Sequence, residues 1–156
     1  RLQLAAGVQT GQVLDLAAAR TGRRLQLKFG GNASLGRGGL LAWDLLHQRL
    51  RRDGGTAFTA QLANLSGSWQ LDPRQRLRLI LQGSRVQRNP ALYPSGVNAR
   101  SRDWAGQLVY SYKVDPRTAL YAGGSYGAFM DDDNPDLFGN ARSLFLKLSW
   151  GFQPAV

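Results

Sequence analysis

Few side chains in this sequence could carry out acid–base chemistry. His47 is the single histidine, and Asp44 lies three residues before it. The pair raises the alternative of a barrel-borne hydrolase. A catalytic site also needs a nucleophile and an oriented base, and neither accompanies these two residues. The sequence has no cysteine and no glycine-rich phosphate-binding motif. We therefore expect no catalytic residue, no cofactor and no enzymatic activity.

A run of aspartates near the C-terminus is the second candidate for chemistry. Asp131, Asp133 and Asp136 offer the hard oxygen ligands that Ca²⁺ prefers. The spacing is not that of an EF-hand, because no glycine follows at the sixth position from any of these aspartates. We expect a solvated surface loop, with weak Ca²⁺ binding as the alternative, and no other metal site.

The charge of the chain is strongly basic and rests on arginine. Lysine and arginine number 20 against 10 acidic residues, which gives a net charge of +10. The only lysines are Lys28, Lys113 and Lys147, and every acidic residue is an aspartate. Nucleic acid, anionic lipid or lipopolysaccharide, and small anions are all compatible partners, and composition does not distinguish among them.

Alternation of apolar and polar residues is the main structural signal, and it is clearest between residues 142 and 152. Leucines and aromatics occupy every second position and therefore share one face of a strand: Leu144, Leu146, Leu148, Trp150 and Phe152. The other face carries Phe145, Lys147, Ser149 and Gly151. An apolar face that ends in aromatics is typical of a strand with lipid on its outside. Taken alone, this strand also fits an ordinary sandwich with one wet face.

Similar alternation over most of the chain predicts about nine strands in an antiparallel meander. We expect a turn at Thr10–Gln12, followed by a weakly patterned segment, 13–19, which is a strand or a short helix. Segment 39–52 fits an amphipathic helix or a strand. We favour the strand, because the glycine-rich stretch 52–55 has hairpin-turn chemistry. A change in the parity of the apolar positions predicts a β-bulge near Asn64.

A repeated turn organises one rim of the predicted sheet. Residues 69–77 are echoed by 112–120, each with an aromatic residue, an Asp-Pro turn and a new strand in the same register. The turn residues are Asp72, Pro73, Asp115 and Pro116. Proline presets φ at the second turn position, and aspartate caps the turn through its side chain.

The connections at the opposite rim are long and polar. They comprise residues 88–103 and residues 130–140. Short turns on one side and long loops on the other are typical of outer-membrane barrels, in which the turns face the periplasm and the loops face the cell surface. A soluble sandwich has no reason to sort its connections in this way.

The alternation assigns two sets of side chains to opposite faces. The outward, lipid-facing aromatics are Trp69, Trp104, Tyr110, Tyr112, Trp150 and Phe152. The inward, lumen-facing basic residues are Arg24, Lys28, Arg76, Arg78, Lys113 and Lys147. An arginine that faces lipid at the bilayer midplane costs about 2–4 kcal/mol, so a membrane-spanning chain must turn these residues inward.

Several of these segments resemble the C-terminal region of a bacterial family called domain of unknown function 5916. The resemblance covers roughly residues 51–154 and rests on segments 51–55, 88–93, 107–118 and 145–150. It implies an outer-membrane β-barrel that, in full-length members, follows a module similar to family 9 carbohydrate-binding domains. Asp-Pro-Arg-Thr at 115–118 stands where relatives are expected to have Asn-Pro-Gln-Thr, which keeps the turn chemistry. The family brings no known catalytic residues.

The expected protein is therefore a single β-barrel domain over residues 1–156, all or part of a transmembrane outer-membrane β-barrel. Single-chain bacterial barrels have an even strand number, so about nine strands indicate the C-terminal part of a larger barrel. We expect a pore or a membrane-embedded component of a cell-surface assembly in the bacterial outer membrane. Its expected partners are outer-membrane lipid, lipopolysaccharide and other envelope proteins, with no nucleic acid.

One alternative of a different class is a soluble basic β-module that binds nucleic acid. In that case Tyr110, Tyr112 and Tyr121 would stack on bases, and Arg76 or Arg78 would contact phosphates.

Overall fold

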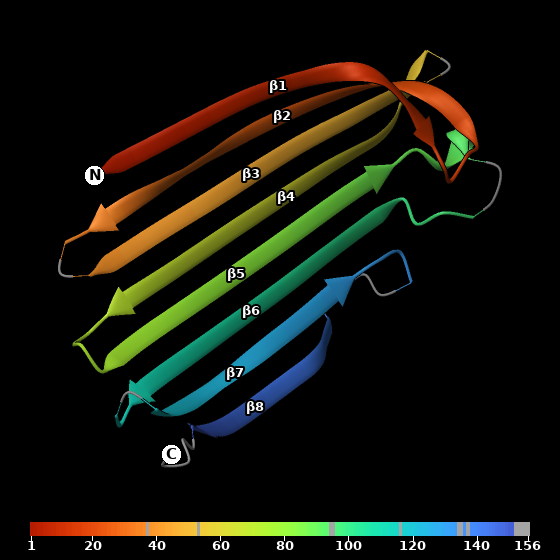
Figure 1. Ribbon diagram of the computed structural model, residues 1–156. Coiled ribbons are helices and arrows are strands. Elements are labelled where there is room, and N and C mark those ends of the chain that lie inside the picture. The colour runs from red at the N-terminus through yellow and green to blue at the C-terminus, as the bar shows by residue number, and fades with distance from the viewer. Residues whose placement is uncertain are drawn as a thin grey trace, which may run out of the picture.

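A single antiparallel sheet of eight strands makes up nearly the whole chain in the computed structural model (Figure 1). The structure describes residues 1–36, 38–52, 54–93, 96–115, 117–133, 136 and 138–151. The elements in chain order are β1 (Leu2–Asp15), β2 (Arg20–Leu35), β3 (Gly39–Arg52), β4 (Gly55–Gln70), β5 (Gln75–Arg88), the 3₁₀ helix η1 (Pro90–Leu92), β6 (Arg100–Lys113), β7 (Thr118–Met130) and β8 (Phe138–Trp150).

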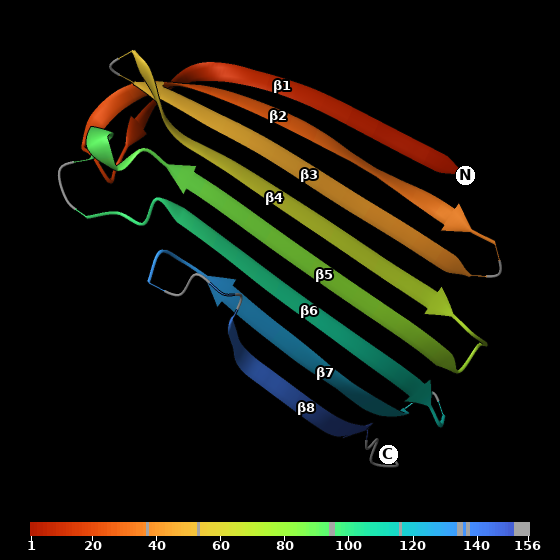
Figure 2. The same cartoon turned by 180° about the vertical axis from the view of Figure 1, so that it is seen from behind.

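Each inner strand pairs with the strands before and after it in the chain, so the sheet is a meander whose edges are β1 and β8. Figure 2 shows the same order from behind, with the two edge strands on opposite sides of the open sheet. The all-β antiparallel meander expected from the sequence is therefore confirmed. Among the described residues, no helix is long and apolar enough to cross a membrane.

The sheet has eight strands where the sequence suggests nine, because β1 is one long strand. The turn expected at Thr10–Gln12 is wrong, since these residues pair with β2 in regular register. The reversal comes after Asp15, whose Oδ1 accepts a hydrogen bond of 3.2 Å from the amide of Ala17. Ala19 completes the turn at φ 50. A capping aspartate therefore outweighs a flexible Thr-Gly pair as the local signal for the turn.

The strand predicted over 39–52 is confirmed as β3, and a hairpin joins it to β4. Gly54 in this hairpin has φ 77, the left-handed conformation that glycine adopts without steric cost. The amphipathic-helix alternative fails because its apolar residues are divided between two faces of a sheet. Leu50, for example, is fully buried on one face, whereas Leu45 is exposed on the other.

The predicted bulge near Asn64 is wrong in position. Asn64 pairs regularly with its partner in β3, and the register instead shifts beside Leu50, which leaves Ala57 as the extra residue in β4. Leu50 and Ala57 are both fully buried. The bulge therefore lies at the end of the hairpin, where it packs a small apolar cluster.

The two long loops lie at the end of the sheet opposite the Asp-Pro turns, as predicted, but short connections occur at both ends, because β1–β2 and β3–β4 also join through short turns. Turns that follow β2, β4 and β6 lie at one end, hereafter the turn end, together with the start of β1 and the end of β8 (Figure 1). The connections that follow β1, β3, β5 and β7 lie at the other, the loop end. The longest of these, between β5 and β6, contains η1.

The two Asp-Pro turns have the same hydrogen bonds. Asp72 Oδ1 accepts from the amides of Arg74 and Gln75 at 2.7 and 2.8 Å. Asp115 Oδ1 accepts from the amides of Arg117 and Thr118 at 2.7 and 2.9 Å. Pro73 follows Asp72 as expected, and Pro116 lies outside the described residues. The predicted turn repeat is confirmed by geometry as well as by sequence.

The sheet has little interior of its own. Its exposed area is 11074 Å², whereas a folded monomer of 17.1 kDa is expected to expose about 7,800 Å². In the part of the chain that the structure describes, the buried apolar residues are Leu50, Ala57 and Ala128. The sheet thus exposes about 3,000 Å² more surface than this expectation.

Candidate functional site

One face of the sheet, hereafter the apolar face, carries most of the exposed hydrophobic side chains. Strand pairing places on it five of the predicted lipid-facing aromatics: Trp69, Trp104, Tyr110, Tyr112 and Trp150. Leu108 is 48% exposed there and Leu4 is 59% exposed. Phe152, the sixth predicted aromatic, lies outside the described residues.

A line of arginines bounds the apolar face toward the loop end, and the line runs obliquely across the strands. The register row that begins at Arg142 on β8 reaches β2 at Gly31. Arg23, the outward arginine of β2, lies eight residues before Gly31. At about 3.3 Å per residue and about 4.8 Å between strands, this offset is about 26 Å over about 29 Å of sheet, a slope of about 42°. Arg85 on β5 lies halfway along the same line.

The edge of the apolar face at the turn end is oblique in the same direction. Aromatics mark it: Trp69 on β4, Tyr112 on β6 and Trp150 on β8. The row through Trp69 reaches β8 at Leu146, four residues before Trp150. This offset is about 13 Å over about 19 Å, a slope of about 35°. The two edges therefore enclose a band that crosses the strands at about 35–42°.

The width of this band can be measured on β6. Arg102 marks one edge and Tyr112 the other, ten residues apart and both on the apolar face. Ten residues span about 33 Å along the strand, or about 25 Å perpendicular to a band inclined by about 42°.

The opposite face, hereafter the polar face, carries all six basic residues predicted to face a lumen. Pairing places Arg24, Lys28, Arg76, Arg78, Lys113 and Lys147 on it. Arg76, Arg78 and Lys113 line one hollow of about 360 Å³ near the turn end, beside Tyr121. Lys147 follows on β8, next to Tyr121 in the ladder.

The other two members of this basic set lie closer to the loop end. Lys28 lines a larger hollow of about 890 Å³ that it shares with Asp44. Arg24 is paired in register with Leu50. The polar face is thus basic at both ends, with an acidic residue between them.

Acidic residues of the strands are all on the polar face. Among the described strand residues these are Asp15, Asp44 and Asp103. Asp103 accepts a hydrogen bond of 2.9 Å from the hydroxyl of Ser84. The apolar face has no strand aspartate in the same described residues, although it carries several arginines.

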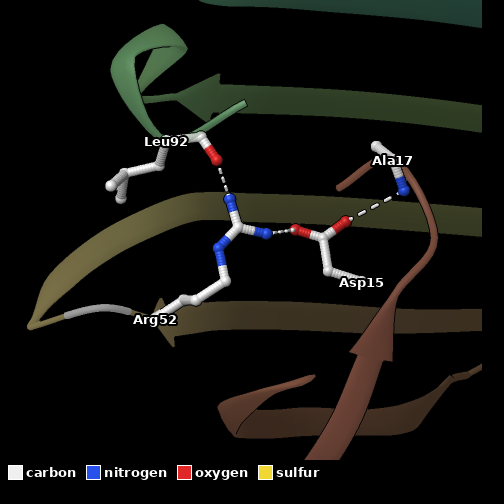
Figure 3. A network of polar contacts seen from close by, with 4 residues as sticks. All are labelled: Asp15, Ala17, Arg52 and Leu92. Atoms are coloured by element: carbon white, nitrogen blue, oxygen red, sulfur yellow. Dashed lines mark hydrogen bonds and ion pairs between the residues drawn. The ribbon is translucent and has the colours of Figure 1, made fainter. Parts of the chain in front are cut away.

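A network of polar contacts ties the loop end together across the polar face (Figure 3). Arg52 is 4% exposed, and its Nη1 donates to Asp15 Oδ2 at 2.9 Å. Its Nη2 donates to the carbonyl oxygen of Leu92, the last residue of η1, and its guanidinium lies 4.9 Å from the ring centre of Tyr93. The loop between β5 and β6 is thereby folded back over the ends of β1 and β3.

Two pKa values outside the strand segments follow from these contacts. Burial of the phenol, with the Asp15 carboxylate as the next contribution, raises the pKa of Tyr93 above its ordinary value. Hydrogen bonds from the turn amides, that of Arg117 first, lower the pKa of Asp115. The first shift keeps Tyr93 neutral within the network, and the second keeps the turn aspartate ionised.

The candidate catalytic and metal residues are not brought together. His47 projects from the apolar face and Asp44 from the polar face, so the two side chains lie on opposite sides of the sheet. Asp132 accepts hydrogen bonds from the amides of Ala99 and Arg100, which links the two long loops. Among the described residues, no three His, Cys, Asp or Glu side chains converge as metal ligands.

The residues proposed for nucleic-acid stacking are also divided. Tyr110 and Tyr112 lie on the apolar face, whereas Tyr121, Arg76 and Arg78 lie on the polar face. The stacking and phosphate contacts expected for a nucleic-acid module therefore do not form one surface.

Sequence reasoning missed the outward arginines at the loop end. Arg49, Arg85, Arg100 and Arg102 share the apolar face with Trp104. Arg85 and Arg102 have the same parity as the leucines and tryptophan of their own strands. Continuing the alternation to the strand ends could have found these two arginines.

Comparisons with known proteins do not assign this chain to a family. No family model, no curated protein and no solved structure matches it. The resemblance to the domain of unknown function 5916 family thus stays a prediction.

Proposed function

We propose that this chain is the membrane-embedded sheet of a bacterial outer-membrane β-barrel. The observation that carries the proposal is the oblique band on the apolar face. Strands of such barrels are tilted by about 35–45°, and their apolar band is about 25 Å tall. The slope of about 42° and the width of about 25 Å agree with both values. A sheet packed on a soluble core has no reason to end its apolar residues along a line inclined to the strands.

The unusually large exposed area supports the same proposal. In a barrel, lipid covers the apolar face, and further strands or another copy pair with the open edges of β1 and β8. Aromatic residues at the turn end then lie at the periplasmic interface, and the long loops lie at the cell surface.

The polar face becomes the barrel interior in this arrangement. A positive region near the periplasmic end of this interior is formed by Arg76, Arg78 and Lys113. The network around Arg52 narrows the interior at its cell-surface end. Rings of arginine and lysine favour anions in pores. We therefore propose a pore for small anions, or the membrane-embedded component of a cell-surface assembly.

Heat-modifiable migration in detergent gels tests the proposal. The full-length protein is expected to need detergent for extraction and to migrate differently before and after boiling. Solubility in plain buffer, together with salt-dependent retention on nucleic acid, would favour the soluble basic module instead. That result would remove the membrane proposal.

A further inference from the structure

The apolar face contains a groove at the point where its hydrophobic band meets the outer arginines. The groove has a volume of about 580 Å³, and Phe29, Leu45, Ala63 and Trp104 line its apolar part. The groove is hollow at this point because Ala63 has a small side chain and Gly83 has none, whereas their neighbours are larger. The ring of Trp104 lies over Gly83, where an added Cβ would be 3.4 Å from the indole.

One end of the groove is cationic. Arg85 and Arg102 line it and are direct cross-strand partners on β5 and β6. His47 and Gln61, the next two residues in the same row, line it as well. Like charges that face each other across a strand pair are destabilising, so an anion between the two guanidinium groups would relieve their repulsion.

No carboxylate of the described strands can serve as that anion, since the strand aspartates are on the polar face. Neither arginine forms an ion pair with a described residue, and both side chains are exposed. Arg49 and Arg100 add two further cations on the same face, two residues closer to the loop end. The loop carboxylate of Asp132 is bound instead by the amides of Ala99 and Arg100. The site therefore combines an apolar channel with two arginines that form no ion pair with a described residue.

We propose that this groove binds the phosphorylated headgroup of an outer-leaflet glycolipid, the lipid A part of lipopolysaccharide. Phosphate bridges Arg85 and Arg102, and an acyl chain lies along Phe29, Leu45 and Trp104 toward the middle of the band. The inference rests on the proposed function, which places the loop end in the outer leaflet. Phosphates of lipid A lie at the boundary between headgroup and acyl chains, which is where this cluster meets the apolar band.

Native mass spectrometry of the detergent-solubilised full-length protein measures this binding, with purified lipid A as the probe. Each arginine near an anionic lipid surface contributes about 1 kcal/mol, or about fivefold in affinity. Arg85→Gln together with Arg102→Gln is therefore expected to weaken lipid A binding by about 25-fold. The matched control is Arg76→Gln with Arg78→Gln, which removes the same charge from the polar face and is expected to stay within about twofold of the wild type.

A second measurement needs no variant. Lipid A without its phosphates is expected to bind the wild-type protein at least about tenfold more weakly. Equal binding of lipid A by the wild type and the Arg85/Arg102 variant, equal binding of the dephosphorylated form, or an equal loss in the control would overturn the inference. So would a second copy of the chain seated on this face, seen as a dimer that lipid A does not displace.

Failure of the inference is distinguishable from failure of the proposed function. A protein that shows heat-modifiable migration but ignores lipid A remains a membrane barrel without this site. A protein that lacks heat-modifiable migration removes both proposals.

Discussion

Replacing Leu108 with arginine separates the membrane proposal from any soluble alternative. Leu108 lies on the apolar face of β6, six residues from Arg102 and four from Tyr112, the two edges of the band. Four residues along a strand inclined by about 42° place it about 10 Å inside the edge at the turn end, close to the middle of a band about 25 Å tall. An outward arginine at the bilayer midplane costs about 2–4 kcal/mol. The folding equilibrium of Leu108→Arg is thus expected to fall by about 30- to 1,000-fold.

Reversible unfolding from lipid vesicles in guanidinium chloride, followed by tryptophan fluorescence, measures this loss. Gln107→Arg is the matched control, because the neighbouring side chain points to the polar face, where repulsion from the nearby Arg78 is expected to cost less than about 1 kcal/mol. Tyr112→Arg, at the edge of the band, is expected to cost about 0–1 kcal/mol from the change in depth alone. In water, by contrast, an arginine at the 48% exposed Leu108 would be nearly neutral. Equal stability of Leu108→Arg and Gln107→Arg in vesicles would refute the assignment of this face to lipid.

Three further predictions concern the loop network, the turns and the polar face. Arg52→Ala leaves the buried Asp15 carboxylate without its guanidinium partner. The free energy of unfolding in the same assay is expected to fall by about 3–5 kcal/mol. A fall of less than about 1 kcal/mol would contradict the stabilising role given to this ion pair. The lowered pKa of Asp115 means that its stabilising effect is complete above the unfolded value near pH 4 and is lost as the pH falls toward the folded value. The protection of the turn amides against exchange, corrected for the intrinsic rate at each pH, is therefore expected to fall on acidification in the wild type but not in Asp115→Asn, and equal protection profiles would contradict this role. If the complete barrel conducts, reversal potentials under a KCl gradient are expected to show selectivity for anions. This selectivity is expected to weaken in the double variant Arg76→Gln with Arg78→Gln, and also at high salt, because the Debye length shrinks from about 10 Å at 0.1 M to about 3 Å at 1 M. A cation-selective wild type would exclude an anion pore.

Local sequence signals predicted the parts of the fold that depend on local chemistry. Alternation placed Lys147 and Trp150 on opposite faces of β8, and the aspartates of the two repeated turns predicted two of the three reversals at the turn end. The error in strand number had a local cause as well. Thr10–Gln12 has turn-forming residues but lies in the middle of β1, where pairing with β2 outweighs its weak preference.

The network around Arg52 could not be predicted from the sequence in the same way. Its partners come from β1, β3 and the loop after β5, and only the folded sheet brings them together. The groove beside Trp104 likewise depends on Ala63 and Gly83 being neighbours across two strands. Both features are products of long-range register, which alternation within one strand does not specify.

The same register explains why net charge is a poor guide to the role of an arginine in this chain. Arg78 and Arg85 are on one strand, seven residues apart, so their side chains project from opposite faces. In the proposed barrel, Arg78 lies within the height of the apolar band and is accommodated there only because it faces away from lipid. In the same proposed arrangement, Arg85 faces lipid and is accommodated only because it lies at the edge of the band, where the cost of a charge falls to about 0–1 kcal/mol. The face on which an arginine lies and its height within the band together determine whether it lines the proposed barrel interior or contacts a lipid headgroup. The height in turn follows from the tilt of the strands.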